Sequence, residues 1–157
     1  MSVGIIFQHF WQDQNHSDER KALEQSIDLI YQLPKHVPTL SMHNTQEQIL
    51  DQLKTMSALT VDHTPITDGD GCKQVLRNWI QKNDINVIYI AGLHFEHCVM
   101  AVCDLLKQIC NESNRDWENN FRVRVIRQCT AFVENESFWF IDKQQAIEQA
   151  VLDIDEF

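Results

Sequence analysis

The sequence predicts an α/β domain of three layers, in which helices cover both faces of a mainly parallel sheet. Segments rich in β-branched residues alternate with segments whose apolar residues recur every three or four positions, as in amphipathic helices. Residues 87–91, Val-Ile-Tyr-Ile-Ala, form an unbroken apolar run that is typical of a strand buried on both faces. With 157 residues, 43% of them hydrophobic, the chain is long enough for one core, and we expect a single domain over residues 1–157.

The first elements are indicated by composition and spacing. Residues 2–7 are apolar and β-branched, and they predict the first strand. A helix is expected after Ser17, because apolar residues recur at three- and four-residue steps until Pro34 ends the pattern. Residues 37–42 predict the second strand. This order, strand, helix and strand, is the beginning of a parallel sheet.

The middle of the chain contains two further expected helices separated by a loop. Residues 45–56 and residues 72–82 both have apolar positions at helical spacing. The stretch between them, residues 57–71, shows little periodicity and ends in Asp-Gly-Asp-Gly at residues 68–71. We therefore expect a long loop over 57–71 with a turn at its end, and long loops often contribute to function.

The second half repeats the alternation. The strand at 87–91 ends at Gly92, and residues 97–110 predict a helix that is apolar almost all round and therefore heavily buried. Residues 121–126 predict another strand and residues 144–152 a final helix. In a sheet of this kind, ligands bind at the carboxyl ends of the strands.

Charge and motifs exclude several classes of function. Thirteen Lys and Arg against 23 Asp and Glu give a net charge of −10, which repels nucleic acid and anionic membranes. No apolar run approaches the roughly 18 residues of a membrane span, and the first residues lack signal-peptide features, so we expect a cytoplasmic protein without a membrane partner. Five cysteines without a CxxC pair indicate reduced thiols. Phosphate-loop, dinucleotide and serine-hydrolase motifs are absent, and no cofactor is expected.

The strongest candidate for chemistry is Cys98. The buried strand ends at Gly92, five residues follow, and Cys98 comes at the start of the next helix. The positive end of that helix and its unbonded N–H groups would stabilise a thiolate, and the same N–H groups could hold the oxyanion formed when a thiolate attacks a carbonyl. The alternative is that Cys98 is a small buried hydrophobic residue, the commoner fate of a lone cysteine.

This stretch resembles the isochorismatase-like cysteine hydrolases, which include the nicotinamidases. The family's sequence of strand, Gly, five residues, Cys-Val and buried helix is matched with Gly92, Cys98 and Val99 in register. The resemblance is good over residues 72–150 and implies the fold named above. It also implies Cys98 as the nucleophile toward a small amide, with Gly92, His97 and Val99 in the turn that forms the oxyanion hole.

Two other residues of the family mechanism are not matched. The family has an Asp at the end of the first strand, where this chain has Phe7-Gln8-His9, and the nearest carboxylate is Asp13. The family also has a Lys before the helix preceding the nucleophile strand, but here residues 55–72 contain none. Proton transfer would then need another group, and His9 and His94 are the candidates, because both follow strands that end at one sheet edge. The alternative is that His9 and His94 are ordinary histidines at the rim of the sheet, without a role in catalysis.

Two readings of function follow. Either Cys98 hydrolyses a small amide with His9 or His94 as proton carrier, or the chain keeps the fold without hydrolysis and acts as a ligand-binding or oligomeric partner protein. His94, His97 and Cys98 could together be metal ligands, but the family's metal motif is missing, and no metal is expected. The resemblance also makes a homo-oligomer plausible, with four aromatic residues either packing the domain or covering a partner surface: Phe132, Phe138, Trp139 and Phe140.

Overall fold

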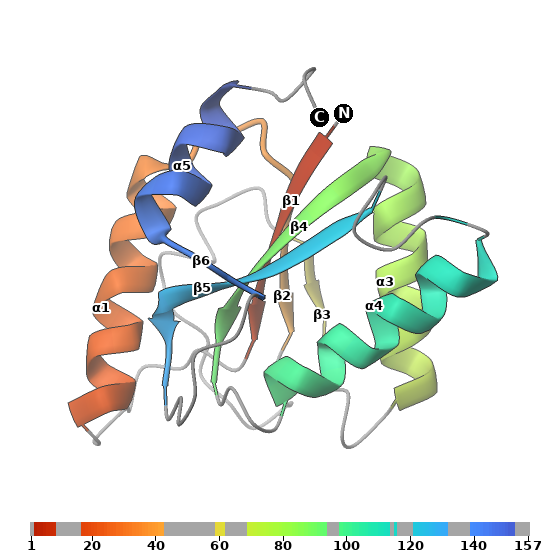
Figure 1. The fold of residues 1–157 in the computed structure, drawn as a ribbon, viewed down its shortest axis with the longest axis horizontal. Coiled ribbons are helices and arrows are strands. Elements are labelled where there is room, and N and C mark those ends of the chain that lie inside the picture. The colour runs from red at the N-terminus through yellow and green to blue at the C-terminus, as the bar shows by residue number, and fades with distance from the viewer. Residues whose placement is uncertain are drawn as a thin grey trace.

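A computed structural model of the chain gives the fold, shown in Figure 1. The structure describes these residues: 2–8, 17–42, 59–61, 69–93, 98–113, 115, 121–131 and 139–152. The helix expected over residues 45–56 lies outside them.

The centre of the fold is a six-stranded sheet in the order β3-β2-β1-β4-β5-β6, and every pair of neighbouring strands is parallel. Its strands are β1 (Ser2–Gln8), β2 (Thr39–Met42), β3 (Leu59–Val61), β4 (Ile85–Gly92), β5 (Arg122–Thr130) and β6 (Phe140–Ile141). From β1 the chain adds β2 and β3 on one side and β4, β5 and β6 on the other. The strand order therefore reverses between β1 and β4, and parallel sheets bind ligands at the carboxyl ends of the strands at such a point.

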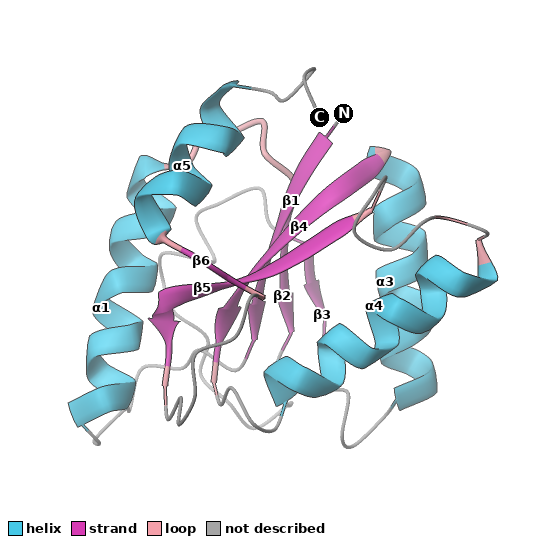
Figure 2. Cartoon of the chain, in the orientation of Figure 1, coloured by secondary structure: helices cyan, strands magenta, loops and turns pink. Residues whose placement is uncertain are grey.

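Helices cover both faces of the sheet, which confirms the predicted three-layer α/β fold (Figure 2). On one side lie α1 (Ser17–Gln32) and α5 (Lys143–Leu152), and on the other lie α3 (Gly69–Asn83) and α4 (Met100–Glu112). Each pair of helices packs its apolar residues against the sheet, so the core has one cluster on either face. None of the helices in the described part of the chain is long and apolar enough to span a membrane.

Ion pairs join the two helices of each layer. On one side, Glu112 of α4 accepts hydrogen bonds from Lys73 and Arg77 of α3. On the other, Lys143 Nζ of α5 lies 2.5 Å from Asp28 Oδ2 of α1. Because these pairs are on the surface, each of them contributes little to stability.

The structure corrects the predictions over residues 57–71. Residues 59–61 form β3 inside the expected loop. The sequence did not reveal this strand, because three residues are too few to show the alternation typical of strands. The expected loop ends earlier than predicted, because Gly69 and Gly71 already belong to the first helical turn of α3. Asp70, between them, stabilises the start of this helix through the favourable interaction of its carboxylate with the positive end of the helix dipole.

The last part of the chain also differs from the prediction. The strand predicted to end at residue 126 continues to Thr130. Trp139 and Phe140 pack against the core on the α3 and α4 side, and Phe140 begins a short edge strand. The other two members of the aromatic group, Phe132 and Phe138, lie outside the described residues.

Candidate active site

The carboxyl ends of three neighbouring strands meet in one row. Gln8, the last residue of β1, pairs with Gly92, the last residue of β4, and Gly92 pairs in turn with Thr130, the last residue of β5. On its other side, Gln8 pairs with Met42 at the end of β2. This row lies at the edge where the strand order reverses, so the topology places the candidate site here.

The side chains of this row face the α3 and α4 layer. In β1, Phe7 packs on the α1 and α5 side and Ile6 on the α3 and α4 side, so the alternation of a strand puts Gln8 with Ile6. Cys129 of β5 and Ala131, directly after this strand, both pack on the α1 and α5 side, which leaves Thr130 on the opposite face. Gln8 and Thr130 therefore point to the face on which α4 begins.

Gly92 allows β1 and β4 to approach closely at this edge. A Cβ at position 92 would lie 2.4 Å from the Gln8 carbonyl oxygen and 2.5 Å from Gln8 Cβ. The Leu93 N–H donates a 3.0 Å hydrogen bond to the same carbonyl oxygen and holds the end of β4 against β1. The sequence prediction that Gly92 closes the strand is confirmed, and the reason is the contact with Gln8.

Two polar side chains at this edge are buried without a partner. The Gln8 side chain is fully buried, and neither Oε1 nor Nε2 has a hydrogen-bond partner in the described structure. Thr130 is 8% exposed, and for its Oγ1 the described structure likewise provides no partner. An unpaired buried polar group costs about 1–3 kcal/mol, and such costs commonly persist where a ligand is bound.

Cys98 lies where the chain enters α4. Residues 98 and 99 form a wider, π-type turn, and the regular α-helix begins at Met100, two residues after Cys98. Turns of this type are frequent at functional sites. Figure 1 shows that α4 begins at the edge where the arrowheads of β1 and β4 lie. The turn that contains Cys98 therefore leads into α4 at this edge of the sheet.

Val99 is the N-cap residue of α4, and its side chain is buried in the same core cluster as Ile6 and Ile90. A valine has no side-chain oxygen with which to cap the helix. Cys98 precedes this N-cap directly, so it lies at the end of the helix where the dipole is positive.

The five cysteines are all buried, and none of them forms a disulfide. Burial raises the pKa of Cys103 and of Cys129 to about 12. Cys103 is 3% exposed and Cys129 fully buried, whereas Cys98 is 9% exposed. Cys103 and Cys129 are thus structural thiols, and they serve as internal references for Cys98.

Three of the predicted site residues lie among the described residues: Gly92 ends β4, and Cys98 and Val99 form the turn into α4. The proposed proton carriers His9 and His94, and the turn residue His97, lie outside the described residues. Among the described residues, His, Cys, Asp and Glu side chains form no group of three that could hold a metal.

Sequence reasoning missed Gln8 and Thr130 as site residues. Gln8 ends an otherwise apolar strand at 3–8, but Thr130 follows Arg124, Arg127 and Gln128 in its own strand, so nothing in the sequence distinguishes it. The lack of a hydrogen-bond partner depends on the packing of other elements.

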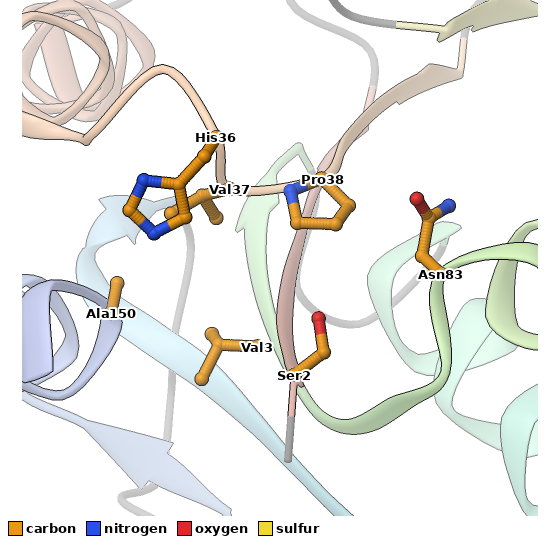
Figure 3. A pocket seen from close by; sticks show the side chains of 7 residues that line it. All are labelled: Ser2, Val3, His36, Val37, Pro38, Asn83 and Ala150. Atoms are coloured by element: carbon orange, nitrogen blue, oxygen red, sulfur yellow. The ribbon is translucent and has the colours of Figure 1, made fainter. Parts of the chain in front are cut away.

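A separate cavity lies at the opposite edge of the sheet (Figure 3). Its volume is about 220 Å³, and Figure 3 shows His36 and Asn83 on opposite sides of it. It is lined by Ser2, Val3, His36, Val37, Pro38, Asn83 and Ala150. Since it adjoins the amino ends of β1 and β2 and contains neither a thiol nor a carboxylate, it is a poorer candidate for the active site than the carboxyl edge.

Comparison with known proteins identifies the fold. No family model matches the sequence, and no curated protein matches it. Among solved structures, the chain is similar to an isochorismatase from Pseudomonas putida, with a TM-score of 0.59 and 10% identity over 96% of this chain and 81% of that one. The chain therefore has an isochorismatase-like fold, which confirms the predicted fold.

Two further similar structures are YcaC proteins. YcaC from Pseudomonas aeruginosa, described with hexane-2,5-diol and covalent acrylamide, gives a TM-score of 0.55 at 10% identity over 97% of this chain and 73% of that one. The YcaC gene product from Escherichia coli, described as an octameric hydrolase of unknown specificity, gives 0.53 at 10% identity over 96% and 69%.

Proposed function

We propose that the protein is a cysteine hydrolase that cleaves small amides at the carboxyl edge of its sheet, with Cys98 as the nucleophile. The proposal rests chiefly on one observation. Cys98 lies in the turn that leads into α4, and α4 begins at the edge of the sheet where two buried polar side chains at strand ends have no partner within the described residues. The isochorismatase-like fold, which is that of a P. putida isochorismatase and of a hydrolase from E. coli, supports the same class of activity.

The reaction proceeds in two steps. The Cys98 sulfur gives its proton to a carrier, His9 or His94, and attacks the amide carbonyl carbon. The N–H groups at the start of α4 stabilise the oxyanion. The C–N bond then breaks, the amine leaves with the proton from the carrier, and a thioester remains. Water attacks the thioester, releases the carboxylic acid and restores the thiol.

The test is ammonia release from a panel of small saturated primary amides, beginning with propionamide. We expect Cys98→Ser to lose at least 100-fold in kcat/KM. Cys103→Ala is the matched control. Cys103 is also a buried cysteine, but it lies within α4 and not in the turn that precedes this helix. The proposal would be wrong if Cys98→Ser retained the wild-type rate, or if no amide in the panel were hydrolysed by the wild type.

We also propose that the chain forms a homo-oligomer. The support is its similarity to the E. coli YcaC gene product, which is described as octameric. Size-exclusion chromatography with light scattering measures the mass directly. A multiple of 18.4 kDa is expected, and a monomer at micromolar concentration would contradict the proposal.

A further inference from the structure

We propose that the cavity at the amino edge of the sheet is a second binding site, for a small organic cation that carries a primary ammonium on a compact apolar group. The cavity adjoins the first residues of β1, at the end of this strand opposite to the carboxyl edge. The inference therefore does not depend on the proposed hydrolase activity. Its support is the lining of the cavity, the helices that end there and the charge of the chain.

The cavity has an apolar floor. Its volume is about 220 Å³, and one molecule of liquid water takes up about 30 Å³, so a ligand of roughly seven non-hydrogen atoms fits. Val3, Val37 and Ala150 line the cavity, and all three belong to the core cluster on the α1 and α5 side. A ligand that covers these side chains removes apolar surface from water, which favours a compact hydrocarbon group.

The polar groups beside this floor include two oxygens that accept hydrogen bonds. Asn83 Nδ2 donates a 2.9 Å hydrogen bond to the Trp79 carbonyl, which fixes the amide and leaves Oδ1 as the acceptor. Figure 3 shows this oxygen on the side of Asn83 that faces Pro38, and it shows the Ser2 hydroxyl pointing toward the space between these two residues. An ammonium group has three N–H donors, so it can donate to both oxygens.

Two helices end at the cavity, and the negative ends of their dipoles favour a cation. Asn83 is the last residue of α3, and Ala150 lies in the last turn of α5. The last carbonyls of a helix have no partner within that helix, and they carry the negative end of its dipole. The last turn of α5 contains no basic residue, so its own side chains do not compensate this negative end.

The charges around the cavity argue against an anionic ligand. None of the residues that line it is Lys or Arg. Lys82 and Asp84, on either side of Asn83 in the sequence, are both exposed and have opposite charges. Lys35, next to His36, is exposed as well, so solvent and salt screen its charge. The whole chain has a net charge of −10, which attracts cations and repels anions.

His36 offers a way to change the charge of the site without disturbing the core. It lies across the cavity from Asn83, as Figure 3 shows, and its side chain is exposed. Above neutral pH, histidine side chains are generally uncharged. A lysine at this position would therefore place a new positive charge beside the ligand.

The test compares two probes with the same number of non-hydrogen atoms, cyclohexylammonium and cyclohexanol, which differ in charge and hardly in shape. Their affinities are measured by saturation-transfer NMR titration at about pH 8 and constant ionic strength. We expect cyclohexylammonium to bind about fivefold more tightly than cyclohexanol. Cyclohexanecarboxylate, the anionic probe, should bind more weakly than either.

His36→Lys should weaken the binding of cyclohexylammonium about fivefold and leave that of cyclohexanol unchanged, because it mainly adds a charge. The matched control is Gln144→Lys, which adds the same charge at an exposed position near the other end of α5 and should have little effect. Ala150→Leu and Ser2→Leu should fill part of the cavity and weaken both probes. If Ala150→Leu does not fold, Ser2→Leu decides, because Ser2 is only partly buried.

Equal binding of cyclohexylammonium and cyclohexanol, no binding of either, or tighter binding of the carboxylate would overturn the proposal. A preference for the cation that survives in His36→Lys would do so too. If Gln144→Lys lowered the preference as much as His36→Lys, the cause would be the net charge of the protein and not this cavity. Amide turnover does not enter the test, so the cation site and the hydrolase can each fail without the other.

Discussion

The two edges of the sheet use their polar groups in opposite ways. At the amino edge, Arg115 Nη1 donates a 2.9 Å hydrogen bond to the Ile85 carbonyl, and its guanidinium lies 5.4 Å from the centre of the Phe121 ring. At the carboxyl edge, Gln8 and Thr130 are buried without a partner in the described structure. The hydrogen bond from Arg115 holds the amino edge of the fold together, whereas the described residues provide no partner for Gln8 and Thr130.

The connections on either side of β4 also differ. Before it, α3 ends at Asn83 and β4 begins at Ile85, with Asp84 between them at φ 50°. After it, β4 ends at Gly92 and α4 begins at Met100, after the turn that contains Cys98. The longer of these two connections is the one at the carboxyl edge, and long connections often carry binding groups.

The largest expected effect comes from Gly92→Ala. The new Cβ would lie 2.4 Å from the Gln8 carbonyl oxygen, which is backbone and cannot move without shifting β1. We expect a loss of about 3 kcal/mol in the free energy of unfolding, measured by urea denaturation, together with loss of propionamide binding. Gly69→Ala is the control, because its Cβ would meet nothing within 4 Å, and in a helix it should stabilise slightly. Equal effects of the two substitutions would refute the close approach.

A smaller effect is expected at the amino edge from Arg115→Ala. This change removes the hydrogen bond to the Ile85 carbonyl and the contact with Phe121, and should cost about 1–2 kcal/mol in the free energy of unfolding. Propionamide binding and amide turnover should not change once the protein is folded. A selective loss of binding at unchanged stability would show that the two edges are not independent.

The smallest effect concerns the surface link between α3 and α4. Hydrogen bonds from Lys73 and Arg77 lower the pKa of Glu112 below its ordinary value of 4.5. A lowered folded-state pKa means that the stabilisation is present above pH 4.5 and is lost as the pH falls through the lowered pKa. Glu112→Gln should lower the melting temperature by about 2 °C at pH 7, and the difference should shrink as the pH falls below 4.5. A difference that does not shrink in acid would contradict this origin.

Much of the fold is predictable because the apolar pattern directly reports burial. Residues 87–91 are buried on both faces of the sheet, as their unbroken apolar run predicts, and Ala146, Ile147 and Ala150 form the buried side of α5. The pattern fails where tertiary contacts decide. Val151 shares the apolar character of that helix, yet it is 53% exposed, and β3 is too short to have a period.

The candidate site is predictable only in part. Gly92 and Cys98 stand out because a strand, a turn and a helix follow one another in the sequence with fixed spacing. Gln8 and Thr130 do not, because they are 122 positions apart and become neighbours of Gly92 only through strand order and register. What distinguishes them is that the described residues offer no hydrogen-bond partner to their buried polar atoms. The lack of a partner cannot be predicted from a local sequence pattern.

The most direct test of the central claim is acrylamide labelling of the folded protein at neutral pH, with each cysteine followed by peptide mass spectrometry. Acrylamide adds to thiolates, and it is found covalently bound in the P. aeruginosa YcaC structure. We predict that Cys98 is modified at least tenfold faster than Cys103 and Cys129, whose pKa values burial raises to about 12, and that propionamide slows its modification. Labelling of Cys98 only after unfolding, at the rate of those two buried thiols, would contradict the assignment of the active site to the carboxyl edge.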